Sequence, residues 1–280
     1  MTSDRLPTYF ISHGGGPWPW IKDLMPGDTS LLEASLTAIP LQIDVVPRAV
    51  LVVSGHWEQP EFTVQTSPNP PMLYDYGGFP AFTYEIQYSA PGSPDVAARV
   101  GELLDAAGIP NRADPRRGFD HGVFAPLYVM YPDARVPVLQ LSLRHGYDPE
   151  AHLAAGRAIA PLRDEGVLIV GSGLTYHDLR NFGPSAQAPS AEFDHWLDEA
   201  LVHADPEERT RRLLSWTDAP SARASHPSED HLAPLFVAVG AAEHDAGVRV
   251  YHEDAFFGGV TSSSFAFGLR AEVAAAAAAR

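Results

Sequence analysis

Short apolar runs that end near Ser, Gly or His alternate along this chain with longer segments of helical periodicity. The runs are rich in β-branched residues and lie at Thr8–Ile11, Ala49–Val53, Val136–Leu141 and Val167–Val170. Runs of this kind are typical of buried strands in a largely parallel sheet. Helical spacing is found at Asp95–Ala107, Pro149–Asp164, Ala191–His203 and Glu229–Ala242. The alternation predicts an α/β fold, a three-layer single domain with a central, mostly parallel sheet and helices on both faces.

Two Pro- and Ser-rich segments interrupt this alternation, at residues 57–93 and 205–228. We interpret both as long ordered loops over the functional site, with short strands in the first at Thr63–Gln65 and Tyr84–Gln87. No internal repeat or linker divides the sequence, so residues 1–280 are expected to form one domain. The Ala-rich end, Glu272–Arg280, is expected to be a frayed helix without a functional signal.

Composition excludes several classes of chemistry and of partner. The 280 residues include no cysteine, which rules out disulfides, thiolate nucleophiles and iron–sulfur clusters. Lys22 is the only lysine, so Schiff-base chemistry would depend on that one residue. The formal charge of -16 argues against nucleic-acid binding, which needs clustered Lys and Arg. Because no stretch approaches the roughly 20 apolar residues of a membrane helix and no signal peptide is recognised, we expect a cytoplasmic protein.

Three histidines follow the apolar runs at the points where the strands are expected to end. His13 lies in YFISHGGG, His56 in VVSGHW, and His177 in VGSGLTYH after a short turn. In open α/β sheets, ligands bind beyond the carboxyl ends of the strands. A single His after a strand is more often a hydrogen-bonded loop residue, but histidines on neighbouring parallel strands would meet at one rim. Since neutral imidazole is the commonest protein metal ligand, this convergence predicts a metal site.

Further histidines lie in polar segments. Ser228 suits an N-cap, which would place His231 in the first turn of a helix and keep its ring neutral. The alternative is that His231 and His226 only cap a surface helix. His121 lies in a polar Asp-His-Gly turn. The remaining histidines have polar neighbours and are expected to be solvated at the surface: His145, His152, His195, His203, His244 and His252.

Eight motifs follow one another along nearly the whole chain. They are SHGGGPW at 12–18, SGHW at 54–57, YDYGGFP at 74–80, YSAPGSP at 88–94, GFDHG at 118–122, YPDARVPVLQLS at 131–142, SGLTYHDL at 172–179 and HPSEDHLAPLFVAVGAA at 226–242. This ordered series resembles the 4,5-DOPA dioxygenase family of class III extradiol dioxygenases. The resemblance implies an enzyme that uses non-haem Fe(II) and O2 to cleave the ring of a DOPA-like or related catechol to a muconic semialdehyde.

The resemblance also implies roles for individual residues. His13, His56 and His231 would bind the metal, expected to be Fe(II) for activity, with Zn(II) as another ion that the site could hold. His177 would act as the acid/base, and His121 would bind substrate or relay protons. In more distant relatives the third ligand is a glutamate, which makes Glu229 or Asp230 alternatives to His231. The residues expected near the substrate are Tyr74, Asp75, Phe79 and Trp18.

The sequence leaves the substrate and one rival activity open. Members of the family often have Gly-Ser-Pro after the first histidine, whereas here three glycines precede Pro17, Trp18, Pro19 and Trp20. The two tryptophans could line an altered aromatic pocket. A zinc hydrolase on the same histidines is the alternative function, and a non-catalytic metal-binding protein is a second one. The expected partners are a small aromatic diol and O2, and the expected assembly is a monomer or a small homo-oligomer.

Overall fold

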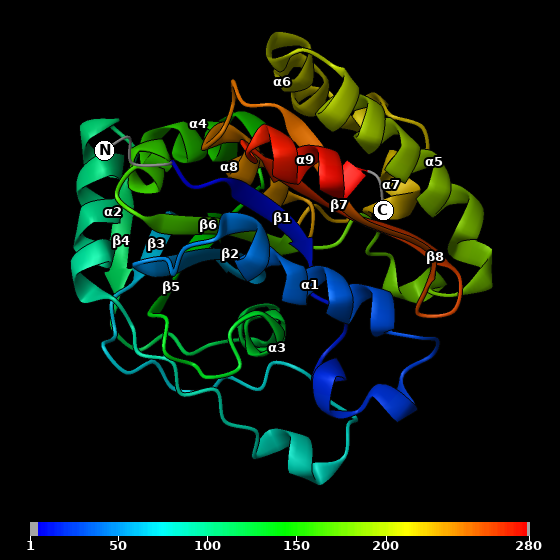
Figure 1. Ribbon diagram of the computed structural model, residues 1–280, viewed down its shortest axis with the longest axis horizontal. Helices are drawn as coiled ribbons and strands as arrows, with labels where there is room; N and C mark the ends of the chain where they lie inside the picture. Colours follow the sequence, from blue (N-terminus) through cyan, green and yellow to red (C-terminus); the bar gives the residue numbers. More distant parts are fainter. Residues whose placement is uncertain (1–4, 279–280) are drawn as a thin grey trace.

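A computed structural model describes residues 5–278, which form one eight-stranded sheet with helices against both faces (Figure 1). The strand order is β4-β3-β5-β2-β6-β1-β8-β7. Its centre consists of four parallel strands, β5 (Val138–Arg144), β2 (Ala49–Gln59), β6 (Val167–Gly173) and β1 (Thr8–Ser12). The expectation of an α/β fold with a mostly parallel central sheet is therefore confirmed.

Shorter or antiparallel strands flank this parallel centre. On one side β3 (Phe62–Gln65) pairs antiparallel with β5 and parallel with β4 (Asn111–Asp114). On the other side β8 (Val260–Phe267) pairs antiparallel with both β1 and β7 (Gly247–Phe256). The carboxyl ends of the four central strands consequently meet at one edge of the sheet.

Helices cover the sheet in two separate hydrophobic clusters. One cluster holds the inner faces of α2 (Pro94–Ala106), α4 (Pro149–Ile159), α5 (Gln187–Asp198) and α8 (Ala233–Gly240). The opposite cluster holds those of α1 (Ser30–Ile43) and α3 (His121–Met130). Successive side chains along each strand point to opposite faces of the sheet and so contribute to both clusters. Leu51 of β2 belongs to the first cluster and Val50 to the second. Burial on both faces explains why the central strands are almost continuously apolar.

The four predicted strands and four predicted helices are present, with shifted ends. The helix expected at Glu229–Ala242 begins only at Ala233, because residues 229–232 form a turn in which Glu229 O accepts from the amides of Leu232 and Ala233. His231 therefore lies just before this helix and not in its first turn. His231 and His226 are 2% and 0% exposed, so they do not cap a surface helix.

Two interpretations of the Pro- and Ser-rich segments are wrong. The strand expected at Tyr84–Gln87 is absent, because residues 81–84 turn into a 3₁₀ helix in which the amide of Thr83 donates to Pro80 O at 2.9 Å. Residues 205–228 are not mainly loop. They contain α6 (Pro206–Leu214), which the Asp205 side chain caps by accepting from the amide of Glu208, and the short α7 (Ala222–Ser225).

The expectation that His152 is a solvated surface residue is also wrong, since its ring is 0% exposed. It lies on the inner face of α4 in a T-shaped contact with Phe62, at a centroid distance of 5.2 Å. Its Nε2 accepts from the amide of Arg144 at 3.2 Å, and its Nδ1 donates to Asp148 O at 2.8 Å. Both ring nitrogens are thus satisfied, which allows the ring to be buried.

The carboxyl-terminal helix α9 (Ala271–Ala278) agrees with the helix expected at Glu272–Arg280, whose last two residues lie outside the described part of the chain. Between residues 5 and 278 the structure contains no helix with the length and apolar character needed to cross a membrane.

Candidate metal centre

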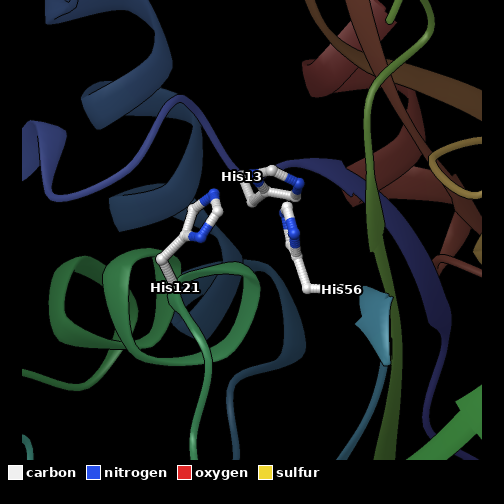
Figure 2. A group of neighbouring side chains, drawn as sticks. All are labelled: His13, His56 and His121. Carbon is white, nitrogen blue, oxygen red and sulfur yellow. The ribbon is translucent and has the colours of Figure 1, made fainter. Parts of the chain in front are cut away.

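Five histidines from distant parts of the sequence meet at the carboxyl edge of the sheet. His13 follows β1, His56 lies in β2, His121 begins α3, His177 follows β6, and His231 precedes α8. The His13 ring centroid is 5.0 Å from that of His56, 5.3 Å from that of His121 and 5.2 Å from that of His231. Figure 2 shows the rings of His13, His56 and His121 converging on one another. The clustering expected from the strand ends is therefore present in the fold.

Glycines of β2 and β6 let the turn that carries His231 approach the sheet. A Cβ at Gly173 would collide with His231 O, and a Cβ at Gly55 would lie 3.0 Å from Asp230 O. The backbone of the turn is also hydrogen-bonded to the end of β6, because the amide of Leu174 donates to His231 O at 3.1 Å. The SGH sequence within β2 and the GSG sequence at the end of β6 thus allow close backbone approach.

The three glycines after His13 each receive an aromatic ring. Gly14 and Gly16 have positive φ angles of 81° and 51°. A Cβ at any of the three positions would collide with the ring that faces it: Trp18 at Gly14, Phe257 at Gly15 and Phe79 at Gly16. Trp18 is fully buried, and its Nε1 donates to His13 O at 2.8 Å. The three glycines, which stand where the resemblance suggested Gly-Ser-Pro, therefore accommodate aromatic packing against the loop that carries His13.

The Nδ1 atoms of three of the five rings contact oxygen acceptors from the loop after β1 and from the segment after β3. His13 Nδ1 lies 2.7 Å from Gly14 O. The carboxylate of Asp75 reaches His121 Nδ1 at 2.9 Å through Oδ1 and His56 Nδ1 at 3.3 Å through Oδ2. The amide of His121 also donates to Asp75 Oδ1 at 2.9 Å. An acceptor at Nδ1 favours the tautomer in which Nδ1 carries the proton and Nε2 keeps its lone pair.

The other two rings share a second carboxylate. Oδ2 of Asp230 is hydrogen-bonded to His231 Nδ1 and lies 3.4 Å from His177 Nδ1. The rings of His177 and His231 are stacked, with centroids 3.3 Å apart and planes inclined by 18°. Asp230, which the sequence offered as an alternative metal ligand, is here turned toward the two histidines.

The nitrogens that remain fit a bound cation. The Nε2 atoms of His56 and His231 lie 3.1 Å apart, although the Nδ1 contacts leave both as acceptors. His13 Nε2 is buried and has no hydrogen-bond partner among residues 5–278. Two facing lone pairs and a third, unpartnered one are costly unless a cation lies between them. Ligand atoms of His13, His56 and His121 also lie within 4.8 Å of one another.

Burial keeps the rings of His13, His56 and His231 neutral. It lowers the pKa of His13 to about 3 and holds the pKa values of His56 and His231 well below the ordinary value of 6.5, with neighbouring histidines adding to the effect. Burial also lowers the pKa of His177, although the Asp230 carboxylate opposes that shift. Neutral imidazole is the form that coordinates metals, so the site needs no deprotonation at neutral pH.

A buried ion pair supports the site from behind. Asp120, which is 0% exposed, accepts from Ser54 Oγ at 2.7 Å and forms a short ion pair with Arg117. Arg117 also donates to His56 O at 3.2 Å. The pair thereby joins the segment of β2 that carries His56 to the start of α3, where His121 lies. The polar Asp-His-Gly turn at residues 120–122 was the only sequence signal for this ion pair. The sequence did not indicate that Arg117 and Ser54 would be the partners of Asp120.

Aromatic side chains of the 57–93 segment form a wall beside the histidines. The ring of Tyr76 lies 5.9 Å from that of His121 and 5.4 Å from that of Phe79. The hydroxyls of Tyr74 and Tyr76 donate to Ile86 O and Thr83 O, both at 2.6 Å. These hydrogen bonds fix the conformation of the 57–93 segment and hold the two tyrosine rings in the wall.

The residues expected near the substrate fall into two groups. Tyr74, Asp75 and Phe79 lie on this wall or against the histidines. Trp18 is covered completely behind His13. Tyr76, which sequence reasoning did not select, lies in the YDYGGFP motif and could have been found there.

Known proteins with similar sequences are named as dioxygenases. Residues 26–268 match a family described as the catalytic LigB subunit of aromatic ring-opening dioxygenase. The chain is 40% identical to the 4,5-DOPA dioxygenase extradiol of Beta vulgaris, over 91% of this chain and 93% of that protein. It is 34% identical to a protein of the same name from Escherichia coli strain K12, over 96% and 97% of the two chains.

Two further relatives extend this likeness. The dioxygenase tasH of Hapsidospora irregularis is 36% identical over 89% of this chain and 82% of its own length. A crystal structure of an uncharacterized protein from Escherichia coli K12 superposes with a TM-score of 0.74 and 28% identity, over 94% of this chain and all of that one.

Proposed function

The chain belongs to the LigB family of extradiol aromatic ring-opening dioxygenases, and on that basis we propose that it binds Fe(II) and uses O2 to cleave a DOPA-like or related catechol to a muconic semialdehyde. One observation carries the proposal for this chain. The Nε2 atoms of His56 and His231 face each other at 3.1 Å beside the unpartnered Nε2 of His13. Such a set of neutral nitrogens suits a divalent metal.

We assign His13, His56 and His231 as the metal ligands. His121 is the nearest competitor, since its ring centroid lies 3.9 Å from that of His56. Because the Nε2 atoms of His56 and His231 face each other, His231 is favoured over His121 as the third ligand. Glu229 forms an ion pair with Arg223 at 2.7 Å, and Asp230 contacts the Nδ1 atoms of two rings. Neither carboxylate is therefore favoured as the third ligand. His231→Ala should abolish metal binding, whereas His121→Ala should retain it.

Fe(II), when bound by three protein ligands, would supply adjacent open positions for a diol and O2. His177 would accept a proton from the incoming catechol hydroxyl through Nε2, because its Nδ1 faces Asp230. The neighbouring carboxylate would stabilise the imidazolium that results, and the proton would be returned later in the reaction. Help of this kind is typically worth about 100- to 10,000-fold in rate.

His121 would orient the substrate, since Asp75 fixes its ring at Nδ1 and at the backbone amide. Tyr74 and Phe79 would line the space for the aromatic ring, together with Tyr76. Aromatic walls bind flat rings through offset or edge-to-face contacts. We place Trp18 behind His13 because its side chain is fully buried, and we expect it to act by fixing the loop.

The test is anaerobic loading with Fe(II), followed by O2 measurement and absorbance spectra with a panel of catechols. We expect O2 uptake coupled to a yellow ring-opened product. Loading the same preparation with Zn(II) is the control, because zinc has no redox chemistry and should give no O2 uptake. Hydrolysis of an ester or amide by the zinc-loaded protein, without O2 uptake by the Fe(II)-loaded one, would instead establish the zinc hydrolase.

A further inference from the structure

Two carboxylates, Asp75 and Asp230, account for the Nδ1 contacts of four of the five clustered histidines. They come from different segments of the chain. Asp75 lies in the segment after β3, and Asp230 lies in the turn before α8. Their side chains are 17% and 22% exposed, so both carboxylates are mostly shielded from water and close to the rings they contact.

The two carboxylates are used in the same way. Asp75 contacts one assigned metal ligand, His56, and one histidine assigned to substrate, His121. Asp230 contacts another assigned ligand, His231, and the assigned acid/base, His177. Each aspartate therefore links a metal ligand to a histidine that works on the substrate. His13 is different, because a backbone carbonyl, Gly14 O, serves its Nδ1.

The chemical consequence concerns which nitrogen carries the proton. A neutral imidazole has one N–H and one lone pair, and only the lone pair can bind a metal or accept a proton. A carboxylate has only acceptors, so it stabilises the Nδ1–H form and leaves the lone pair on Nε2. If either aspartate were replaced by a group that donates, the ring facing that donor would favour the opposite tautomer.

We propose that Asp75 and Asp230 are positioning residues that set the tautomer and ring orientation of two histidine pairs, His56 with His121 and His231 with His177. This inference rests on the proposed metal site. It assigns the aspartates no contact with substrate or metal. Outer carboxylates of this kind typically contribute about 10- to 100-fold to metal affinity.

The variants Asp75→Asn and Asp230→Leu test the proposal. The two oxygens of Asp75 face different rings, so an amide of the same shape places a donor against one of them. A single oxygen of Asp230, Oδ2, faces both rings, so the acceptor is removed there with Leu, which is similar in size and has no polar side-chain atom. The first measurement is the nitrogen-15 spectrum of labelled histidines in the metal-free protein, which distinguishes the two tautomers. We expect Asp75→Asn to change the signals of His56 or His121 and to leave those of His177 and His231 in place. Asp230→Leu should do the reverse.

The second measurement is the affinity for Zn(II) and Co(II) by calorimetry and by the Co(II) absorption spectrum. Each variant should bind about 10- to 100-fold more weakly than the unaltered protein. The matched control is Glu85→Gln, which removes one negative charge from the same segment at an exposed position that contacts none of the five rings. The His13 ring contacts a backbone carbonyl and neither aspartate, so an unchanged His13 signal in each variant reports that the site is folded.

The outcomes separate this inference from the proposed function. Unchanged tautomers and unchanged metal affinity in both variants would overturn the positioning role while leaving ring cleavage intact. Altered tautomers and weakened metal binding, in a protein that cleaves no catechol, would support the positioning role and count against the proposed activity. Failure of the unaltered protein to bind any divalent metal would overturn both.

Discussion

The imidazole of His177 lies flat against that of His231, with ring centroids 3.3 Å apart, and both rings face Oδ2 of Asp230 through Nδ1. A proton acceptor is thereby held directly beside an assigned metal ligand. The two rings share this acceptor but have different assigned roles. His231, as a metal ligand, must stay neutral, whereas His177, as the acid/base, must gain and lose a proton.

His177→Ala should separate these two tasks. We expect this variant to keep its bound metal and to lose about 100- to 10,000-fold in turnover, because the proton acceptor is missing. His56→Ala should lose both metal and turnover, since it removes an assigned ligand. Metal content after desalting and the rate of ring cleavage measure the two effects, and exposed His145→Ala is the control. Normal ring cleavage by His177→Ala would remove that residue from the mechanism.

Gly16→Ala should damage the site without touching a histidine. A methyl at position 16 would lie 2.8 Å from the Phe79 ring, and the φ of 51° is unfavourable for alanine by about 1–2 kcal/mol. We expect a lower free energy of unfolding and a raised KM, because Phe79 must move. Gly77→Ala is the control in the neighbouring segment, since its methyl would meet no heavy atom of the described chain within 4 Å. Equal KM values for the two variants would contradict the role given to Phe79.

The central sheet could be predicted because its strands are buried on both faces and are apolar almost throughout. The antiparallel strand β8 was not predicted because four hydroxyl residues, Thr261–Ser264, interrupt its apolar pattern. Those hydroxyls are buried and hydrogen-bonded, as when the amide of Ser12 donates to Ser264 Oγ at 2.9 Å. Such pairing depends on which strand lies alongside, and local sequence does not contain that information.

The meeting of His13, His56 and His177 at one rim could be predicted because parallel strands end on the same side of a sheet. The carboxylates behind the rings could not be assigned in this way. Asp75 was expected near the substrate, and only the turn of its segment, fixed by the Tyr74 and Tyr76 hydroxyls, directs it toward His56 and His121. His152 was misplaced for a similar reason, because its burial depends on contact with a distant strand.

Asp120→Ala should strongly destabilise the fold. The variant leaves Arg117, whose side chain is only 13% exposed, beside His56 without its carboxylate partner, and breaking a largely buried pair in this way typically costs about 3–5 kcal/mol. Urea unfolding monitored by tryptophan fluorescence measures the loss. Glu61→Ala is the control, because its pair with Arg112 is exposed to water and should contribute little. Similar midpoints for the two variants would show that the Arg117–Asp120 pair does not stabilise the fold.

His152 makes stability depend on pH, and His152→Gln should remove that dependence. Burial lowers the pKa of His152 to about 4, from an ordinary value near 6.5 that applies to the unfolded chain. Between these values the unfolded state binds the extra proton, so stability falls as the pH decreases through 6.5 and continues to fall toward 4. From pH 7.5 to pH 5.0 this one residue should cost about 2 kcal/mol. Glutamine can offer one donor to Asp148 O and one acceptor to the Arg144 amide without titrating. The free energy of unfolding of the variant should therefore decrease by about 2 kcal/mol less over that range, and parallel pH profiles for the two proteins would refute the assignment.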